Sequence, residues 1–245
     1  RFILAYRTWY DQRRGWRWNT SKAFLRPVRR RANLRVETGV QAEPLLFEGK
    51  RCVGVAYRKN GQEHTVRARR ETMLCMREVQ SPQLLELSGV GNPALLQSNG
   101  IALVHAQPQV GENYIDHFAT RMNWRVRNTV TLNEMSRGWR LAQQVARYYT
   151  RRKGILTLGT GLVHGFVKSA PDLPAADVQY FFVHASYANA AERILDREPG
   201  MTIGVAQLRP ESVGSIHLKS ADPLAAPSIR PNFLSAHIVR DSPVG

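Results

Sequence analysis

The sequence has little of what builds metal sites, disulfide frameworks and membrane spans. Its 245 residues include two cysteines, Cys52 and Cys75, and neither belongs to a C-x-x-C pair. We therefore expect no metal ligands and no disulfides, and a reducing, cytoplasmic setting by default. The most apolar stretch, residues 155–167, is broken by glycines and a histidine. A helix that spans a bilayer needs about 20 consecutive apolar residues, and this stretch is shorter, so no transmembrane helix is expected.

Acidic residues are scarce as well. The chain has 19 Asp and Glu against 35 Lys and Arg, a net charge of +16. Such a surplus favours a polyanionic partner, either nucleic acid or an acidic membrane surface, although charge informs about partners and not about fold. The chain is 43% hydrophobic and can bury a sizeable core. It begins with Arg1, and we expect the natural start to lie upstream.

None of the seven histidines lies in a recognisable catalytic sequence, so no catalytic residue is predicted. Single histidines on predicted strands, such as His105, His184 and His217, are expected to be structural or surface residues. In the pair Asp116 and His117 a carboxylate stands beside an imidazole and could fix its tautomer. A plain loop is the favoured interpretation of that pair.

Alternating apolar residues predict a β-meander over residues 34–75. Its strands are expected at 34–38, 51–58 and 63–68, and Asn60-Gly61 is a strong hairpin-turn signal. Further on, Ser81 as N-cap and Pro82 in the first turn predict a helix. That helix is expected to stop at Gly89 and to be followed by a second helix starting at Asn92 and by a strand at 101–105.

The second half of the chain reads as one long helix and several strands. Apolar spacing predicts an amphipathic helix over 137–153. The strands, expected to form an antiparallel sheet packed with this helix, lie at 165–169, 178–185, 201–208 and 215–219.

Two further features carry competing interpretations. Residues 89–94 fit G-x-G-x-x-A, which cradles a pyrophosphate after a strand, but a predicted helix precedes Gly89, so a corner between helices is favoured. The helix at 137–153 lies in a stretch without acidic residues between Glu134 and Asp172 and mixes arginine with aromatic residues. It would suit an anionic membrane or nucleic acid, whereas a solvated basic face is the commoner explanation.

Residues 81–91, SPQLLELSGVG, resemble the second signature of the glucose-methanol-choline oxidoreductases. The segment from Val110 to His117, VGENYIDH, is similar to the continuation of that signature. Other segments resemble the choline-dehydrogenase-like branch of the family, namely 23–27, 33–36, 47–51, 53–55, 177–179, 208–212 and 231–235. The resemblance covers nearly the whole chain.

The resemblance implies an internal fragment of a two-domain FAD enzyme that oxidises a small alcohol, with an α/β part followed by an α+β part. Residues 31–112 would form part of the FAD-binding domain and residues 113–235 an antiparallel-sheet substrate domain. A connecting segment, 1–30, would precede them, and 236–245 would begin a return to the FAD domain. The resemblance implies no nucleic-acid partner and leaves a peripheral membrane contact open. The alternative function is that of a non-catalytic remnant that binds an anionic membrane or nucleic acid through the basic helix.

The same resemblance implies that Ala42, Ser81 and Pro82 lie near FAD, with Ala42 contacting the adenine through its backbone. It also places the family's glycine-rich fingerprint upstream of Arg1 and its catalytic histidine downstream of Gly245, which predicts that the chain alone is inactive. Residues 76–78, Met-Arg-Glu, stand where the family has a small Ala-Gly-Ala step. Bulky charged residues there are expected to reshape the contact with FAD. Val213 likewise stands where arginine is common.

Overall fold

The computed structural model describes residues 4–7, 12–13, 16–159 and 162–236. They group into two compact units, described here separately. Unit 1 combines the chain before Val36 with His117–Arg209, and unit 2 combines Val36–Asp116 with the chain from Pro210 onward. This grouping divides the segment 113–235 at Arg209. The predicted last segment, 236–245, lies outside the described residues except for Ala236.

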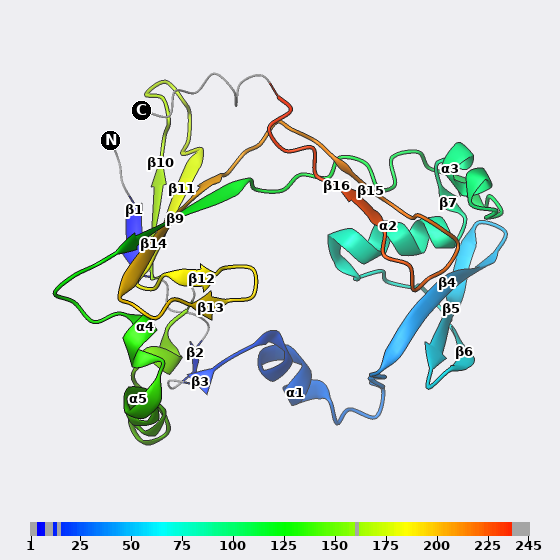
Figure 1. Ribbon diagram of the computed structural model, residues 1–245. Coiled ribbons are helices and arrows are strands. Elements are labelled where there is room, and N and C mark those ends of the chain that lie inside the picture. Colours follow the sequence, from blue (N-terminus) through cyan, green and yellow to red (C-terminus); the bar gives the residue numbers. More distant parts are fainter. Residues whose placement is uncertain (1–3, 8–11, 14–15, 160–161, 237–245) are drawn as a thin grey trace. The chain divides into compact units, whose positions relative to one another are not determined.

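Unit 1 is built on a five-stranded antiparallel sheet (Figure 1). The sheet contains three of the four strands predicted for the second half of the chain. The prediction was wrong for the fourth, 215–219, which lies in unit 2 and pairs there in a separate two-stranded sheet. Residues along strand β14 of the five-stranded sheet alternate between buried and half-buried. This alternation is expected of an inner strand with one well-covered face. In spatial order the strands are β1 (Leu4–Arg7), β10 (Val163–Val167), β11 (Val178–Val183), β14 (Gly200–Gln207) and β9 (Ala119–Arg125).

The long predicted helix of unit 1 is present as α5 (Gly138–Arg151). It ends where Arg152 takes a left-handed conformation at φ +56°, a common way to close a helix. The remaining elements of unit 1 are short: β2 (Gln12–Arg13), β3 (Trp16–Arg17), η1 (Ser21–Leu25), α1 (Arg26–Val28), α4 (Leu132–Met135), η2 (Ile155–Thr157), β12 (Tyr187–Asn189) and β13 (Ile194–Leu195).

A buried asparagine joins α4 to the loops beside the sheet. The side chain of Asn133 is fully buried. Its Oδ1 accepts the N–H of Ser186 at 3.1 Å, and its Nδ2 donates to the carbonyls of Ser186 at 2.8 Å and Asp196 at 3.0 Å. A capping box between Thr131 and Glu134 fixes the start of α4. The amide is thus satisfied on both sides, as a buried polar group must be.

Unit 2 contains the predicted meander, formed by β4 (Val40–Glu48), β5 (Arg51–Lys59) and β6 (Gln62–Arg67). Asn60 and Gly61 both have positive φ, +52° and +80°, as a two-residue hairpin turn of type I′ requires. The strand predicted at 34–38 was wrong, because β4 begins at Val40 opposite Lys59, directly before that turn. The partner strand therefore has no residues left to pair with 34–38.

The helix containing the family signature, α2 (Arg77–Leu87), begins four residues before Ser81. Ser81 was therefore wrongly predicted as its N-cap, and Pro82 lies inside the helix. Pro82 has no N–H to donate to the carbonyl of Glu78, so one backbone bond is missing near the start of the helix. Helix α3 (Pro93–Ser98) starts as predicted, with Asn92 Oδ1 accepting the N–H of Ala94 at 3.0 Å.

Short strands complete unit 2. The strand predicted at 101–105 is reduced to β8 (His105–Ala106), because its parallel partner β7 (Val90–Gly91) offers only two residues for pairing. Strands β15 (Ser215–His217) and β16 (Ser228–Arg230) form a hairpin. Leu87, Leu96 and Leu218 make the buried apolar cluster that holds α2, α3 and the residue after β15 together.

Candidate functional site

The structure places Ala42 in β4, beside α2, where it lines a small cavity. The other lining residues come from β4, α2 and the chain after β15: Gln41, Met76, Gln80, Gln83, Leu84, Leu87 and Pro223. The free volume is about 10 Å³, room for at most about one water molecule. The carbonyl of Ala42 accepts a hydrogen bond from Gln41 Nε2 at 3.3 Å.

Ser81 and Pro82 are half-buried on α2 but do not line this cavity. The structure therefore brings Ala42 to α2 without bringing the two other predicted cofactor-proximal residues to the same space. Met76, at the predicted Met-Arg-Glu departure, is one of the side chains that fill it. An adenine needs far more than about 10 Å³. As arranged here, these residues do not fit the nucleotide of FAD.

The motif at residues 89–94 forms a corner between α2 and α3, as predicted, with the two-residue strand β7 inside it. Gly89 has φ +82°, and a Cβ there would lie 2.4 Å from the carbonyl oxygen of Ala102. A Cβ on Gly91 would lie 3.2 Å from Glu86 Cγ. These glycines are needed for close packing within the protein.

Two carboxylates enclose one histidine in unit 2. Glu86, on α2, is fully buried; its Oε1 lies 2.7 Å from His217 Nδ1, and its Oε2 accepts the backbone N–H of Leu218 at 2.7 Å. The other ring nitrogen, His217 Nε2, lies 3.0 Å from Glu112 Oε1. Burial lowers the pKa of His217, but hydrogen bonds and charges from Glu86 and then Glu112 outweigh it and raise this pKa above its ordinary value.

The expectation that His217 is an ordinary structural or surface histidine missed this cluster. One signal was present in the sequence: Glu86 interrupts an apolar run of leucines at 84, 85 and 87 on a helix. A carboxylate in a buried stripe needs a partner. The identity of that partner, 131 residues away, was not encoded in any local pattern. The geometry links α2 to β15.

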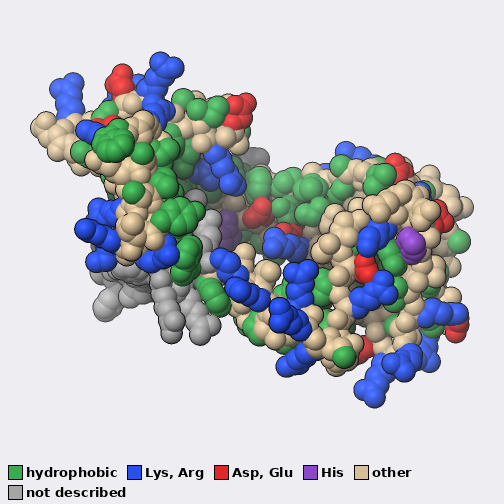
Figure 2. Space-filling model, turned by 90° about the horizontal axis from the view of Figure 1, so that it is seen from below, with side chains coloured by type: hydrophobic (Ala, Val, Ile, Leu, Met, Phe, Trp, Pro, Cys, Tyr) green, Lys and Arg blue, Asp and Glu red, His purple; other side chains and the backbone are tan. Residues whose placement is uncertain are grey.

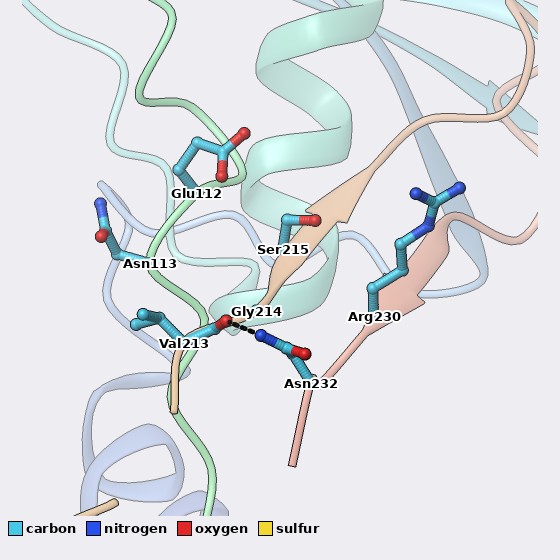
Figure 3. Close-up of a pocket in the computed structure, with 7 residues that line it drawn as sticks. All are labelled: Glu112, Asn113, Val213, Gly214, Ser215, Arg230 and Asn232. Atoms are coloured by element: carbon cyan, nitrogen blue, oxygen red, sulfur yellow. Dashed lines mark hydrogen bonds between the residues drawn. The ribbon is translucent and has the colours of Figure 1, made fainter. Parts of the chain in front are cut away.

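Beside this cluster lies an open polar cavity of about 400 Å³ (Figure 3). Its lining residues carry one carboxylate, one guanidinium and two amides, with Asn232 Nδ2 donating to the carbonyl of Val213 at 2.9 Å. Val213, the residue that departs from the family's arginine, is 44% exposed at its edge. The lining residues are Glu112, Asn113, Val213, Gly214, Ser215, Arg230 and Asn232.

The remaining histidine and carboxylate candidates stay apart. Among the described residues, no three His, Cys, Asp or Glu side chains gather in a way that suits a metal ion. Burial lowers the pKa of His184, whose Nδ1 is buried without a hydrogen-bond partner. Asp116 accepts a hydrogen bond from the hydroxyl of Tyr114 at 2.9 Å, which raises the pKa of that tyrosine. In the part of the chain that the structure describes, no helix is long and apolar enough to span a membrane.

Residues 7–119 match the profile of the GMC oxidoreductase family. An uncharacterized GMC-type oxidoreductase of Mycobacterium tuberculosis is 40% identical over 224 residues, which cover 91% of this chain and 41% of that protein. An alcohol dehydrogenase [acceptor] of Pseudomonas putida is 37% identical, with 91% and 41% covered. An oxygen-dependent choline dehydrogenase of Chromohalobacter salexigens is 34% identical, with 91% and 40% covered.

Solved structures of other proteins share the fold of this chain. Formate oxidase has a TM-score of 0.80 at 23% identity and covers 92% of this chain, which spans 44% of that one. Pyridoxine 4-oxidase from Mesorbium loti has a TM-score of 0.77 at 19% identity, with 95% and 42% covered. The chain spans about 40% of the length of the curated relatives it matches. From its signature helix, its meander and its agreement with these proteins, the chain belongs to the GMC oxidoreductase family.

Proposed function

We propose that this chain forms part of an FAD-dependent alcohol oxidoreductase, in which an alcohol such as choline or a primary alcohol is oxidised and flavin accepts the hydride. The observation that carries the proposal is the identity of 34–37% over 91% of the chain to proteins named choline dehydrogenase and alcohol dehydrogenase. Residues 31–112 would contribute to the FAD-binding part, and the five-stranded sheet within residues 113–235 would contribute to the substrate side.

Within that enzyme Ala42, Ser81 and Pro82 remain our candidates for the residues nearest FAD. Because the cavity at Ala42 holds only about 10 Å³, we infer that Met76 and its neighbours must move before a nucleotide can approach β4. The 245 residues alone are then expected neither to retain FAD nor to oxidise an alcohol. They also offer no residue to which we assign the role of base.

The test compares two proteins expressed in the same host: the 245-residue chain, and the product of the complete reading frame that encodes it. Visible absorption records bound flavin, and an electron-accepting dye records oxidation of choline and of primary alcohols. We expect flavin and alcohol oxidation from the longer product and neither from the 245 residues. A longer product without flavin contradicts the proposed function. Flavin bound to the 245 residues would show that the space at Ala42 opens readily.

A further inference from the structure

The outward face of α5 carries an apolar stripe made of Trp139, Ala142, Val145, Ala146 and Tyr149. Their spacing of three and four residues puts them on adjacent turns of the helix. All five are exposed, Trp139 by 75%, Tyr149 by 61% and Val145 by 37%. Helices on the surface of a protein usually expose polar residues on this side, so the stripe needs an explanation.

A second stripe on the same helix is basic. Arg140, Arg147 and Arg151 lie on one side of α5, all exposed. Arg140 has one carboxylate nearby, Glu134, at 3.6 Å. For Arg147 and Arg151 the described residues provide no carboxylate within ion-pair distance. No acidic residue occurs in the sequence between Glu134 and Asp172, so this basic side is not neutralised locally.

The opposite side of α5 is anchored within unit 1, which fixes the direction of both stripes. Leu141, Gln144 and Tyr148 are half-buried along it. At the end of the helix the guanidinium of Arg152 lies 3.7 Å from the ring centroid of Trp16, and the rings of Trp16 and Tyr148 meet edge to face at 5.8 Å. These contacts hold the helix by its inner side. Tyr149 also meets the ring of Trp16 edge to face at 6.4 Å, so the apolar stripe is anchored at that end, and Trp139 at the other end is its most exposed residue.

We propose that α5 docks on the surface of a bilayer that contains anionic lipids. Phosphate groups of either a lipid or a nucleic acid would attract the arginines, but the exposed apolar stripe with Trp139 and Tyr149, on the other flank of the helix, suits the boundary between headgroups and acyl chains. Figure 2 shows Lys and Arg side chains at many places on one face of the molecule. Positive charge is therefore widespread, and the pairing of charge with an exposed apolar stripe is what distinguishes α5.

The length of α5 agrees with docking and not with insertion across the bilayer. Its 14 residues make a helix about 21 Å long, at about 1.5 Å per residue. The hydrocarbon core of a bilayer is about 30 Å thick, so the helix is too short to cross it. The helix would lie along the interface, with Trp139 toward the lipid and the arginine heads reaching phosphates. This inference is independent of flavin, so it stands or falls separately from the proposed oxidoreductase function.

Flotation with phospholipid vesicles tests the proposal. Vesicles of phosphatidylcholine alone are compared with vesicles that also contain phosphatidylserine, using the 245-residue chain. We expect binding to the anionic vesicles only. Arg147→Gln with Arg151→Gln should weaken this binding about 30-fold, at about 1 kcal/mol for each positive charge removed. The matched control, Arg29→Gln with Arg30→Gln, removes the same charge from an exposed turn in residues 29–30 and should change binding far less.

Trp139→Gln tests the apolar part of the contact. It should weaken vesicle binding, because the indole no longer enters the boundary between headgroups and acyl chains. The proposal is overturned if anionic and neutral vesicles bind alike, if the two double variants have equal effects, or if Trp139→Gln leaves vesicle binding intact. It is also overturned if the product of the complete reading frame does not bind, since another part of the polypeptide would then cover the stripe. Circular dichroism confirms that each variant is folded.

Discussion

Replacing His217 by leucine should destabilise unit 2 far more than a change at an ordinary surface histidine. The substitution takes away the ring nitrogen that lies 2.7 Å from the fully buried carboxylate of Glu86. The backbone N–H of Leu218 would remain as the donor to that carboxylate. Removing one partner of a buried ion pair commonly costs about 3–5 kcal/mol, because the other charge stays buried without compensation.

Two variants calibrate that loss. Glu86→Gln removes the buried charge but keeps an amide oxygen that can accept the N–H of Leu218, so we expect a loss of about 1–2 kcal/mol. Glu112→Gln removes a carboxylate that is 44% exposed, and water screens this side of the imidazole. Its cost should stay below about 1 kcal/mol. The predicted order of destabilisation is therefore His217→Leu, then Glu86→Gln, then Glu112→Gln.

The pH dependence gives a second measure. Because the folded-state pKa of His217 lies above its unfolded value, the protonated ring favours the folded state. Its contribution is fully present below the unfolded value of about 6.5 and is lost as pH rises through the higher folded-state pKa. The stability difference between the wild type and His217→Leu should thus shrink as pH rises above about 6.5.

Urea unfolding followed by circular dichroism at several pH values measures these differences, and hydrogen exchange at the amide of Leu218 reports locally on the contact with Glu86. The reasoning is refuted if His217→Leu costs no more than Glu112→Gln. It is also refuted if the stability difference grows as pH rises, because a histidine with a raised pKa has the opposite sign.

Three further changes test other parts of the fold. Arg77→Gly should raise the free energy of unfolding by up to about 1 kcal/mol in urea unfolding, since Arg77 has φ +61°. Its control, Arg147→Gly in α5, should lower that free energy by about 1 kcal/mol. Equal effects of the two substitutions would contradict the prediction. Asn133→Ala should cost about 3 kcal/mol by leaving buried groups unpaired, and a thermal midpoint equal to that of the wild type would oppose it. The bonds from Ser169 lower the pKa of Asp177 against the opposing effect of burial, so Asp177→Asn should remove stability above about pH 4 and little below it.

Local signals in the sequence predicted those elements in which the turn, cap or apolar face is formed by the same residues that carry the signal. The turn at Asn60-Gly61 needs positive φ at both positions and has it. Asn92 caps α3 through its own side chain, and the apolar spacing of 137–153 produced α5. In each case the residues that carry the signal also make the contact, so no distant partner had to be known.

Elements that depend on a distant partner were misjudged. Residues 34–38 are strand-like in sequence but form no strand, because β5 ends at Lys59, opposite Val40, and offers them no partner. The strand at 101–105 shortened because β7 is short. Strand β9 (Ala119–Arg125) was not predicted, although it completes the sheet of unit 1 beside β14. Pairing between strands is fixed by both partners, and a single stretch of sequence describes only one of them.

The Met-Arg-Glu step, where the resemblance implies a small Ala-Gly-Ala step, holds its middle residue in a conformation that suits glycine. Arg77 adopts φ +61°, the left-handed conformation that glycine takes readily and other residues adopt at a cost. Met76, the residue before it, lines the cavity of about 10 Å³ beside Ala42. The space beside Ala42 is thus limited by the side chains that line it.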